Sequence, residues 1–211
     1  MKHSCVSGVG EISLINGWAR TMSQRLKSSE RYPGCLREIT KEQVQGLATT
    51  YLARIERDAG KGARRIIATM PAHDCHLGFI HLLFPRAKVI HCTRNPMDLG
   101  LSVYFKYFAD GNLYSSAFED IAHYYAGHLQ RMDHWRAVWP IDVLTVQYED
   151  LLENPAQQCT RILQHLELEP EPDVLKNAIA SITKDELLHW KSLEAELAPL
   201  RKSYERHGVR V

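Results

Sequence analysis

A buried strand that ends in an arginine and turns directly into a helix is the feature that limits the possible folds of this chain most. Residues 88–93 are predicted to form a buried central strand, and Arg94 follows it. Asn95 and Pro96 are residue types preferred at the N-cap and at the first position of a helix. We expect the amides and the dipole of this helix to face an anion beyond the strand end. The junction therefore predicts an α/β protein with an anion site.

Three side chains add hydrogen-bond donors to this predicted anion site. The guanidinium of Arg94 is a planar fork that fits a phosphate, although a surface salt bridge is the alternative. Ser102 and Lys106 are four residues apart in a helix predicted over 96–108, so we expect them on one helix face. Together these residues indicate a nucleotide phosphate as the ligand.

The rest of the chain predicts a single domain over residues 1–211 built around a parallel sheet. Strands are expected near 64–70 and over 141–146, and helices over 40–58, 77–84, 118–139 and 154–166. Thr40 and Gln43 have the spacing of a capping box at the start of the first of these helices. Strands and helices alternate, and the apolar strands are continuous, which is typical of parallel α/β sheets.

Composition excludes several classes of protein. A net charge of +1 over 211 residues argues against a general nucleic-acid binder, and no apolar run approaches the length of a membrane span. The five cysteines are odd in number and scattered in spacing, so we expect no disulfide framework and a cytoplasmic location. The segment His73–His76 could ligate a metal, but a polar loop is favoured because no second ligand pair has a recognisable spacing.

The segment Arg94–Asp98, followed by Ser102, resembles the 3′-phosphate-binding segment of sulfotransferases, R-[DN]-P-x-D-x-x-x-S. The stretch from His3 to Glu11 is similar to the H-P-x-V-x-G-x-G-E stretch of the same family. Further segments follow in the family's order: Tyr32-Pro33, Leu83-Phe84-Pro85, Tyr104-Phe105, His134-Trp135-Arg136, Val146–Leu151 and His189-Trp190-Lys191. The chain most resembles bacterial sulfotransferases that are fused to tetratricopeptide repeats, and more distantly tyrosylprotein sulfotransferases.

This resemblance implies a P-loop-like architecture, a three-layer parallel sheet flanked by helices. It implies transfer of a sulfuryl group from 3′-phosphoadenosine 5′-phosphosulfate to a hydroxyl or amine acceptor of unknown identity, without a metal. Arg94, Ser102, Lys106 and Tyr148 correspond to donor-binding positions, and Glu11 corresponds to the general base. Glu149, next to Tyr148, is expected to cap a helix or to face solvent.

The chain also departs from the family pattern. Residues 1–211 contain no counterpart of the family's 5′-phosphosulfate loop, P-R-S-G-T-T, so we expect an N-terminally truncated sheet that lacks its central first strand. Thr69 stands where relatives carry a lysine that stabilises the transferring group. The alternative is therefore a non-catalytic relative that at most binds 3′-phosphoadenosine 5′-phosphate or serves as an interaction module. An exposed sheet edge would favour homo-oligomers or strand exchange with a partner.

Overall fold

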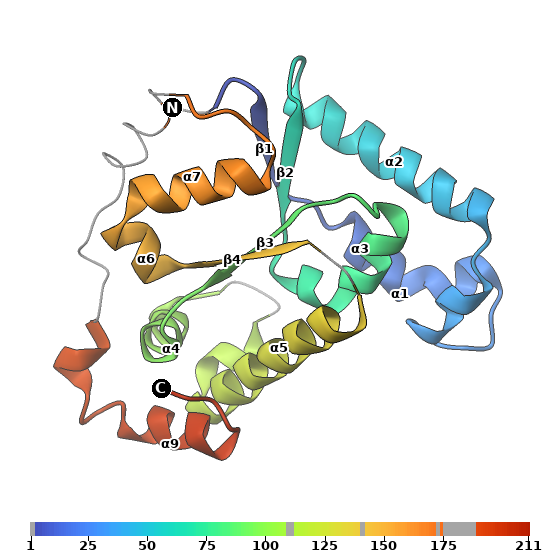
Figure 1. The fold of residues 1–211 in the computed structure, drawn as a ribbon. Helices are drawn as coiled ribbons and strands as arrows, with labels where there is room; N and C mark the ends of the chain where they lie inside the picture. Colours follow the sequence, from blue (N-terminus) through green and yellow to red (C-terminus); the bar gives the residue numbers. More distant parts are fainter. Residues whose placement is uncertain (1–2, 109–111, 140–141, 172–173, 175–188) are drawn as a thin grey trace. The chain divides into compact units, whose positions relative to one another are not determined.

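The structure is a computed structural model that describes residues 3–108, 112–139, 142–171, 174 and 189–211 (Figure 1). It consists of helices and parallel strands, as the sequence predicts. The chain divides into two compact units, Met1–Lys88 with Trp139–Asp142, and Val89–Val138 with Val143–Val211. The single domain over residues 1–211 stays a prediction.

The first unit contains a two-stranded parallel sheet and three α-helices. Its elements are β1 (Val6–Glu11), α1 (Leu14–Leu26), α2 (Lys41–Ala59), β2 (Arg65–Thr69) and α3 (Leu77–Leu83). Helix α2 packs against both strands and against α3 (Figure 1). The core includes Ile15, Met22, Cys35 and Phe79, each at most 1% exposed. Burial of these apolar side chains supplies the main stabilising free energy of the unit.

Helix α2 begins where the sequence predicts, and β1 is an element that sequence reasoning missed. The Thr40 hydroxyl accepts a hydrogen bond from the Gln43 amide, and the Gln43 side chain accepts one from the Thr40 amide, which confirms the capping box. In β1, Gly10 has a φ of 69°, and the pairing with β2 shifts between Gly8 and Gly10. A β-bulge of this kind breaks the alternation that identifies a strand in a sequence.

The second unit holds the junction that the sequence predicts to bind an anion. Its elements are β3 (Val89–Thr93), α4 (Pro96–Phe105), α5 (Phe118–Val138), β4 (Val143–Gln147), α6 (Tyr148–Glu153), α7 (Pro155–His165) and α9 (Ala198–Arg206). Helices α4, α5 and α9 pack together, while α6 and α7 contact β4 (Figure 1). The core between these three helices includes Met97, Ala122, Leu200 and Tyr204.

Parallel pairing is confirmed, but the strands are arranged in two sheets where the sequence predicts one. Strand β1 pairs with β2, and β3 pairs with β4. Among the described residues neither pair has a third strand, so each has edges with unpaired backbone groups. The expected lack of a central first strand stays a prediction.

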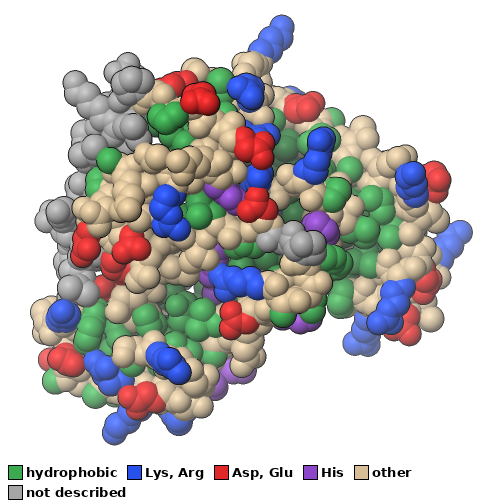
Figure 2. Space-filling view, viewed as in Figure 1, with side chains coloured by type: hydrophobic (Ala, Val, Ile, Leu, Met, Phe, Trp, Pro, Cys, Tyr) green, Lys and Arg blue, Asp and Glu red, His purple; other side chains and the backbone are tan. Residues whose placement is uncertain are grey.

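Composition argues against a general nucleic-acid binder and against a membrane span, and the structure can be compared with both expectations. Basic and acidic side chains are interspersed over the face that Figure 2 shows. No helix in the described part of the chain combines the length and the apolarity needed to cross a membrane.

Candidate functional site

The junction between β3 and α4 has the capped geometry that the sequence predicts. Oδ1 of Asn95 accepts hydrogen bonds from the amides of Met97, at 2.9 Å, and Asp98, at 3.2 Å. Pro96 is the first residue of the helix. A side-chain acceptor on the second and third amides is the usual way in which asparagine stabilises a helix start. The cap and the first helical residue are therefore confirmed.

The expectation that this helix start offers free amides to an anion is wrong. Pro96 has no N–H, and the amides of Met97 and Asp98 donate to the Asn95 side chain. The Leu99 amide donates to the Asn95 carbonyl oxygen at 2.9 Å. Because its own cap uses these donors, α4 can attract an anion only through its dipole and through neighbouring side chains.

Arg94 and Tyr148, both predicted to contact the donor, lie together in the second unit. Thr93 at the end of β3 is the register partner of Gln147 at the end of β4, so the residues that follow the two strands are neighbours. The Arg94 Cζ atom lies 5.0 Å from the centroid of the Tyr148 ring, and both side chains are partly buried. Stacking on an aromatic ring orients the planar guanidinium.

Glu149 ties the two strand ends together, a role that sequence reasoning missed. Its Oε1 atom accepts a hydrogen bond from the Asn95 amide at 2.8 Å, and its Oε2 atom is buried without a hydrogen-bond partner among the described residues. Glu149 thus binds the N-cap residue of α4, and the expectation that it faces solvent is wrong because the residue is half-buried, whereas its neighbour Asp150 is exposed. No local sequence pattern marks this contact, because the Glu149 carboxylate binds a residue 54 positions away in the sequence.

Ser102 and Lys106 do not share a helix face, because α4 ends at Phe105 and not at Phe108. The Lys106 amide donates to the Val103 carbonyl oxygen at 3.3 Å, a tight last turn after which the backbone is extended. The Lys106 Nζ atom lies 5.5 Å from the centroid of the Phe108 ring. Ser102 is an exposed residue within the helix. The predicted pairing of these two side chains is wrong, and their roles in binding stay predictions.

A chain of hydrogen bonds links the middle of β3 to helix α5. Arg136 Nη2 lies 3.1 Å from His91 Nδ1, and His91 Nε2 lies 2.9 Å from His128 Nε2. Since a guanidinium only donates, His91 accepts at Nδ1, carries its proton at Nε2 and donates to His128. Arg136 also donates to the Thr145 hydroxyl on β4 at 3.1 Å. Arg136, from the His134-Trp135-Arg136 segment, thus stabilises the β3–β4 pair by bonding to a residue on each strand.

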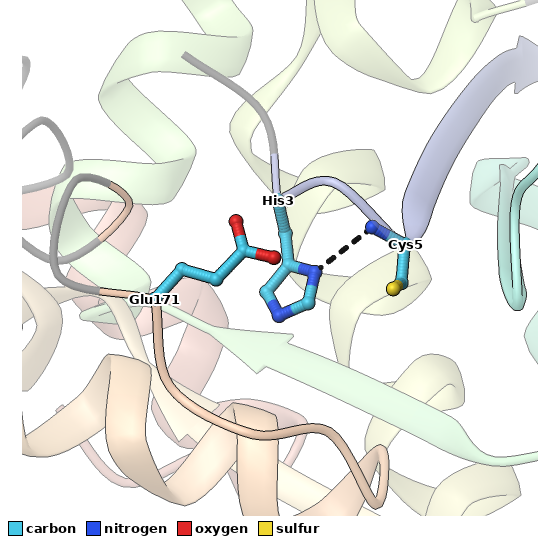
Figure 3. Close-up of side chains that lie close together, drawn as sticks. All are labelled: His3, Cys5 and Glu171. Carbon is cyan, nitrogen blue, oxygen red and sulfur yellow. Dashed lines mark hydrogen bonds between the residues drawn. The ribbon is translucent and has the colours of Figure 1, made fainter.

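In the first unit, Glu11 lies beside Thr69, the residue in the place of the family's lysine. The two residues are register partners at the carboxyl ends of β1 and β2, and both are exposed. The start of β1 is fixed by hydrogen bonds of the Cys5 backbone. The Cys5 amide donates to His3 Nδ1 at 3.1 Å (Figure 3), and the Cys5 carbonyl oxygen accepts from the amides of Arg64 and Arg65.

The segment weighed as a metal ligand set forms a short 3-10 helix, η2 (Pro71–His76). His76 Nδ1 lies 2.9 Å from the Tyr32 hydroxyl. Burial lowers the pKa of both His73 and His76, and it raises the pKa of Tyr32 to about 12. The lowered pKa values favour the neutral form of both imidazoles, and His76 packs against Tyr32.

The family model of the sulfotransferase family matches residues 14–173 of the chain. The chain belongs to the sulfotransferase family. This match covers the β3–α4 junction and Tyr148, and it begins after Glu11. It supports the class of protein that the Arg94–Asp98 segment indicates.

One relative of unknown function matches the chain in sequence, and two solved sulfotransferase domains are similar to it in fold. An uncharacterized protein of Aquifex aeolicus (strain VF5) is 26% identical over 219 residues, which cover 94% of this chain and 29% of that protein. This sulfotransferase chain thus spans less than a third of that relative. The sulfotransferase domain from the curacin biosynthetic pathway has a TM-score of 0.55 at 14% identity, covering 99% of this chain and 90% of that one. The sulfotransferase domain from the Synechococcus PCC 7002 olefin synthase has a TM-score of 0.51 at 23% identity, covering 84% and 68%.

Proposed function

We propose that this sulfotransferase-family protein transfers a sulfuryl group from 3′-phosphoadenosine 5′-phosphosulfate to a hydroxyl or amine acceptor. The observation that supports it most is the Arg94 guanidinium stacked on Tyr148 at the end of β3. A phosphate is recognised best by a planar, oriented guanidinium, and this one follows a strand and precedes a capped helix.

The side chains around the junction fit the 3′-phosphate of that donor. Arg94 supplies charge and a fork of N–H donors. The Ser102 hydroxyl is exposed and has no hydrogen-bond partner among the described residues, so it can donate to a phosphate oxygen. Lys106, which follows the C-terminal end of α4, is exposed and carries positive charge, whereas the positive end of the α4 dipole is at the β3–α4 junction. Because the first-turn amides are used by Asn95, recognition depends on these side chains.

Glu11 is the proposed general base. The donor supplies the sulfuryl group, and the chain must supply a group that accepts the proton of the acceptor hydroxyl or amine as its oxygen or nitrogen is sulfated. A carboxylate exposed at the carboxyl end of a strand is accessible to an acceptor, and Glu11 has this position in β1. The acceptor itself is not specified by these residues.

A second candidate function is binding of 3′-phosphoadenosine 5′-phosphate without transfer. Thr69 favours it, because a hydroxyl in the place of a lysine supplies no positive charge to the transferring group. Loss of one such donor costs about two to three orders of magnitude in rate. The variant Thr69→Lys separates the candidates, since a residual transferase gains rate and a pure binding protein does not.

Thermal unfolding with added nucleotide tests the proposal. Adenosine 3′,5′-bisphosphate at 100 times its dissociation constant is expected to add about 2.7 kcal/mol to the free energy of unfolding. Adenosine 5′-monophosphate at the same concentration is expected to add far less. No stabilisation by either nucleotide would contradict both candidate functions, and stabilisation without label transfer from a radiolabelled donor would favour the second.

A further inference from the structure

Helix α9 contacts the first turn of α4 through a buried hydroxyl. The side chain of Tyr204 is fully buried, and its Oη atom donates a hydrogen bond to the carbonyl oxygen of Pro96 at 2.8 Å. Pro96 is the first residue of α4, directly after the Asn95 cap. The hydrogen bond joins residues 108 positions apart in the sequence. Burial raises the pKa of Tyr204, so this hydroxyl remains protonated and continues to donate.

Gly100 makes this close approach possible. A Cβ atom at this position would lie 2.8 Å from Leu200 Cδ2 and 2.8 Å from the Tyr204 hydroxyl oxygen. Because both distances are shorter than real Cβ contacts, a larger residue would force the Leu200 and Tyr204 side chains to move. The glycine at position 100 therefore allows the two helices to pack closely.

A second contact from the C-terminal part of the chain reaches the same turn. The Trp190 amide donates to Oδ1 of Asp98 at 3.2 Å, and Asp98 is 2% exposed. The cap residue Asn95 is held from the other side by Glu149. The first turn of α4, which directly follows Arg94 and Asn95, is thus fixed by segments far away in sequence before a ligand arrives.

We propose that Tyr204 is a positioning residue, which fixes the first turn of α4 so that Arg94 is oriented toward the 3′-phosphate of the donor. This inference rests on the proposed function, because it assigns the phosphate to the same junction. Helix α9 makes no proposed contact with the donor. The inference is that α9 nevertheless contributes to the affinity of the protein for the donor.

The variant Tyr204→Phe tests the inference, because it removes the hydroxyl and keeps the ring. Its matched control is Tyr51→Phe in the first unit, because Tyr51 is also a core residue and its hydroxyl forms no hydrogen bond with another described residue. Amide hydrogen exchange of residues 95–101 is measured first, without ligand. We expect faster exchange in Tyr204→Phe and unchanged exchange in Tyr51→Phe. Equal exchange in both variants and the wild type would overturn the inference.

Binding of adenosine 3′,5′-bisphosphate and of adenosine 5′-monophosphate is then measured by calorimetry on the folded proteins. Tyr204→Phe is expected to raise the dissociation constant of the bisphosphate about three- to tenfold, the effect of one neutral hydrogen bond, and to leave that of the monophosphate unchanged. An equal rise for both nucleotides, or for neither, would overturn the positioning role. A wild-type protein that binds no bisphosphate would contradict the proposed function, while the exchange comparison still decides whether Tyr204 fixes the turn.

Discussion

The two strand pairs of the molecule hold the residues at their carboxyl ends in different ways. After β3 and β4, Arg94 stacks on Tyr148, and Glu149 binds the Asn95 amide across the two strand ends. At the ends of β1 and β2, Glu11 and Thr69 are exposed register partners. The β1–β2 pairing also contains a shift between Gly8 and Gly10, whereas the β3–β4 register is continuous.

This difference indicates where the chain has preorganised a binding site. Stacked and hydrogen-bonded side chains lose little conformational freedom when a ligand binds, so more of their interaction energy contributes to affinity. An exposed carboxylate such as Glu11 is better suited to a group that exchanges protons with an acceptor than to a binding contact. Substitutions after β3 and β4 should therefore change nucleotide binding, and substitutions after β1 and β2 should not.

The largest effect is expected for Arg94→Ala. Removing the guanidinium eliminates charge-assisted hydrogen bonds worth about 1.5–3 kcal/mol, so the dissociation constant of adenosine 3′,5′-bisphosphate should rise about ten- to a hundredfold in a calorimetric titration. Arg57→Ala is the control, because the Arg57 side chain is 67% exposed on α2 in the first unit. Equal bisphosphate affinities for both variants would contradict the claim that the residues after β3 and β4 bind the nucleotide.

Glu149→Ala should reduce stability by about 1–3 kcal/mol. The substitution leaves the partly buried Asn95 amide without its carboxylate partner and separates the two strand ends. Chemical denaturation measures the loss, and Asp150→Ala, an exposed neighbour, should stay within about 0.5 kcal/mol of the wild type. If the two variants proved equally stable, the carboxylate would not tie β3 to β4.

Removing the N-cap side chain of α4 or of α2 should reduce stability by the same amount, so any difference in nucleotide binding between the two variants is not due to stability. Asn95→Ala on α4 and Thr40→Ala on α2 each remove a side-chain cap, so each should cost about 1 kcal/mol of unfolding free energy. Only Asn95→Ala should weaken binding of the bisphosphate, because only α4 follows the predicted phosphate site. A similar affinity loss in Thr40→Ala would show that the effect is general destabilisation.

The smallest effect concerns pH and the first unit. Burial lowers the pKa of His76, so the unfolded chain binds more protons than the folded one once the pH falls below the ordinary histidine pKa of about 6.5. The stability contributed by the neutral imidazole is present above this pH and is lost as the pH falls toward the lowered value. His76→Gln should flatten the decline in unfolding free energy from pH 7 to pH 5, and the exposed His134→Gln should not. Identical slopes in the two variants would contradict this assignment.

The sequence predicted local features of this molecule better than contacts between distant residues. The Asn95 cap, the Thr40 capping box and the parallel strands were predictable because spacing and residue type determine them. The contacts of Glu149 with Asn95 and of Tyr204 with Pro96 join residues 54 and 108 positions apart, and no short pattern marks them. The sequence does not reveal that the first amides of α4 are occupied, because Asn95-Pro96 has the same pattern whether the Asn95 side chain binds these amides or leaves them free.

One titration tests the central claim, that the β3–α4 junction recognises a 3′-phosphate. Adenosine 3′,5′-bisphosphate and its isomer adenosine 2′,5′-bisphosphate carry the same charge and differ only in the position of one phosphate. If Arg94 and Tyr148 recognise the 3′-phosphate, the first nucleotide should bind at least about tenfold more tightly than the second, a difference of about 1.4 kcal/mol. Equal affinity for the two isomers, or no binding of either, would contradict the claim.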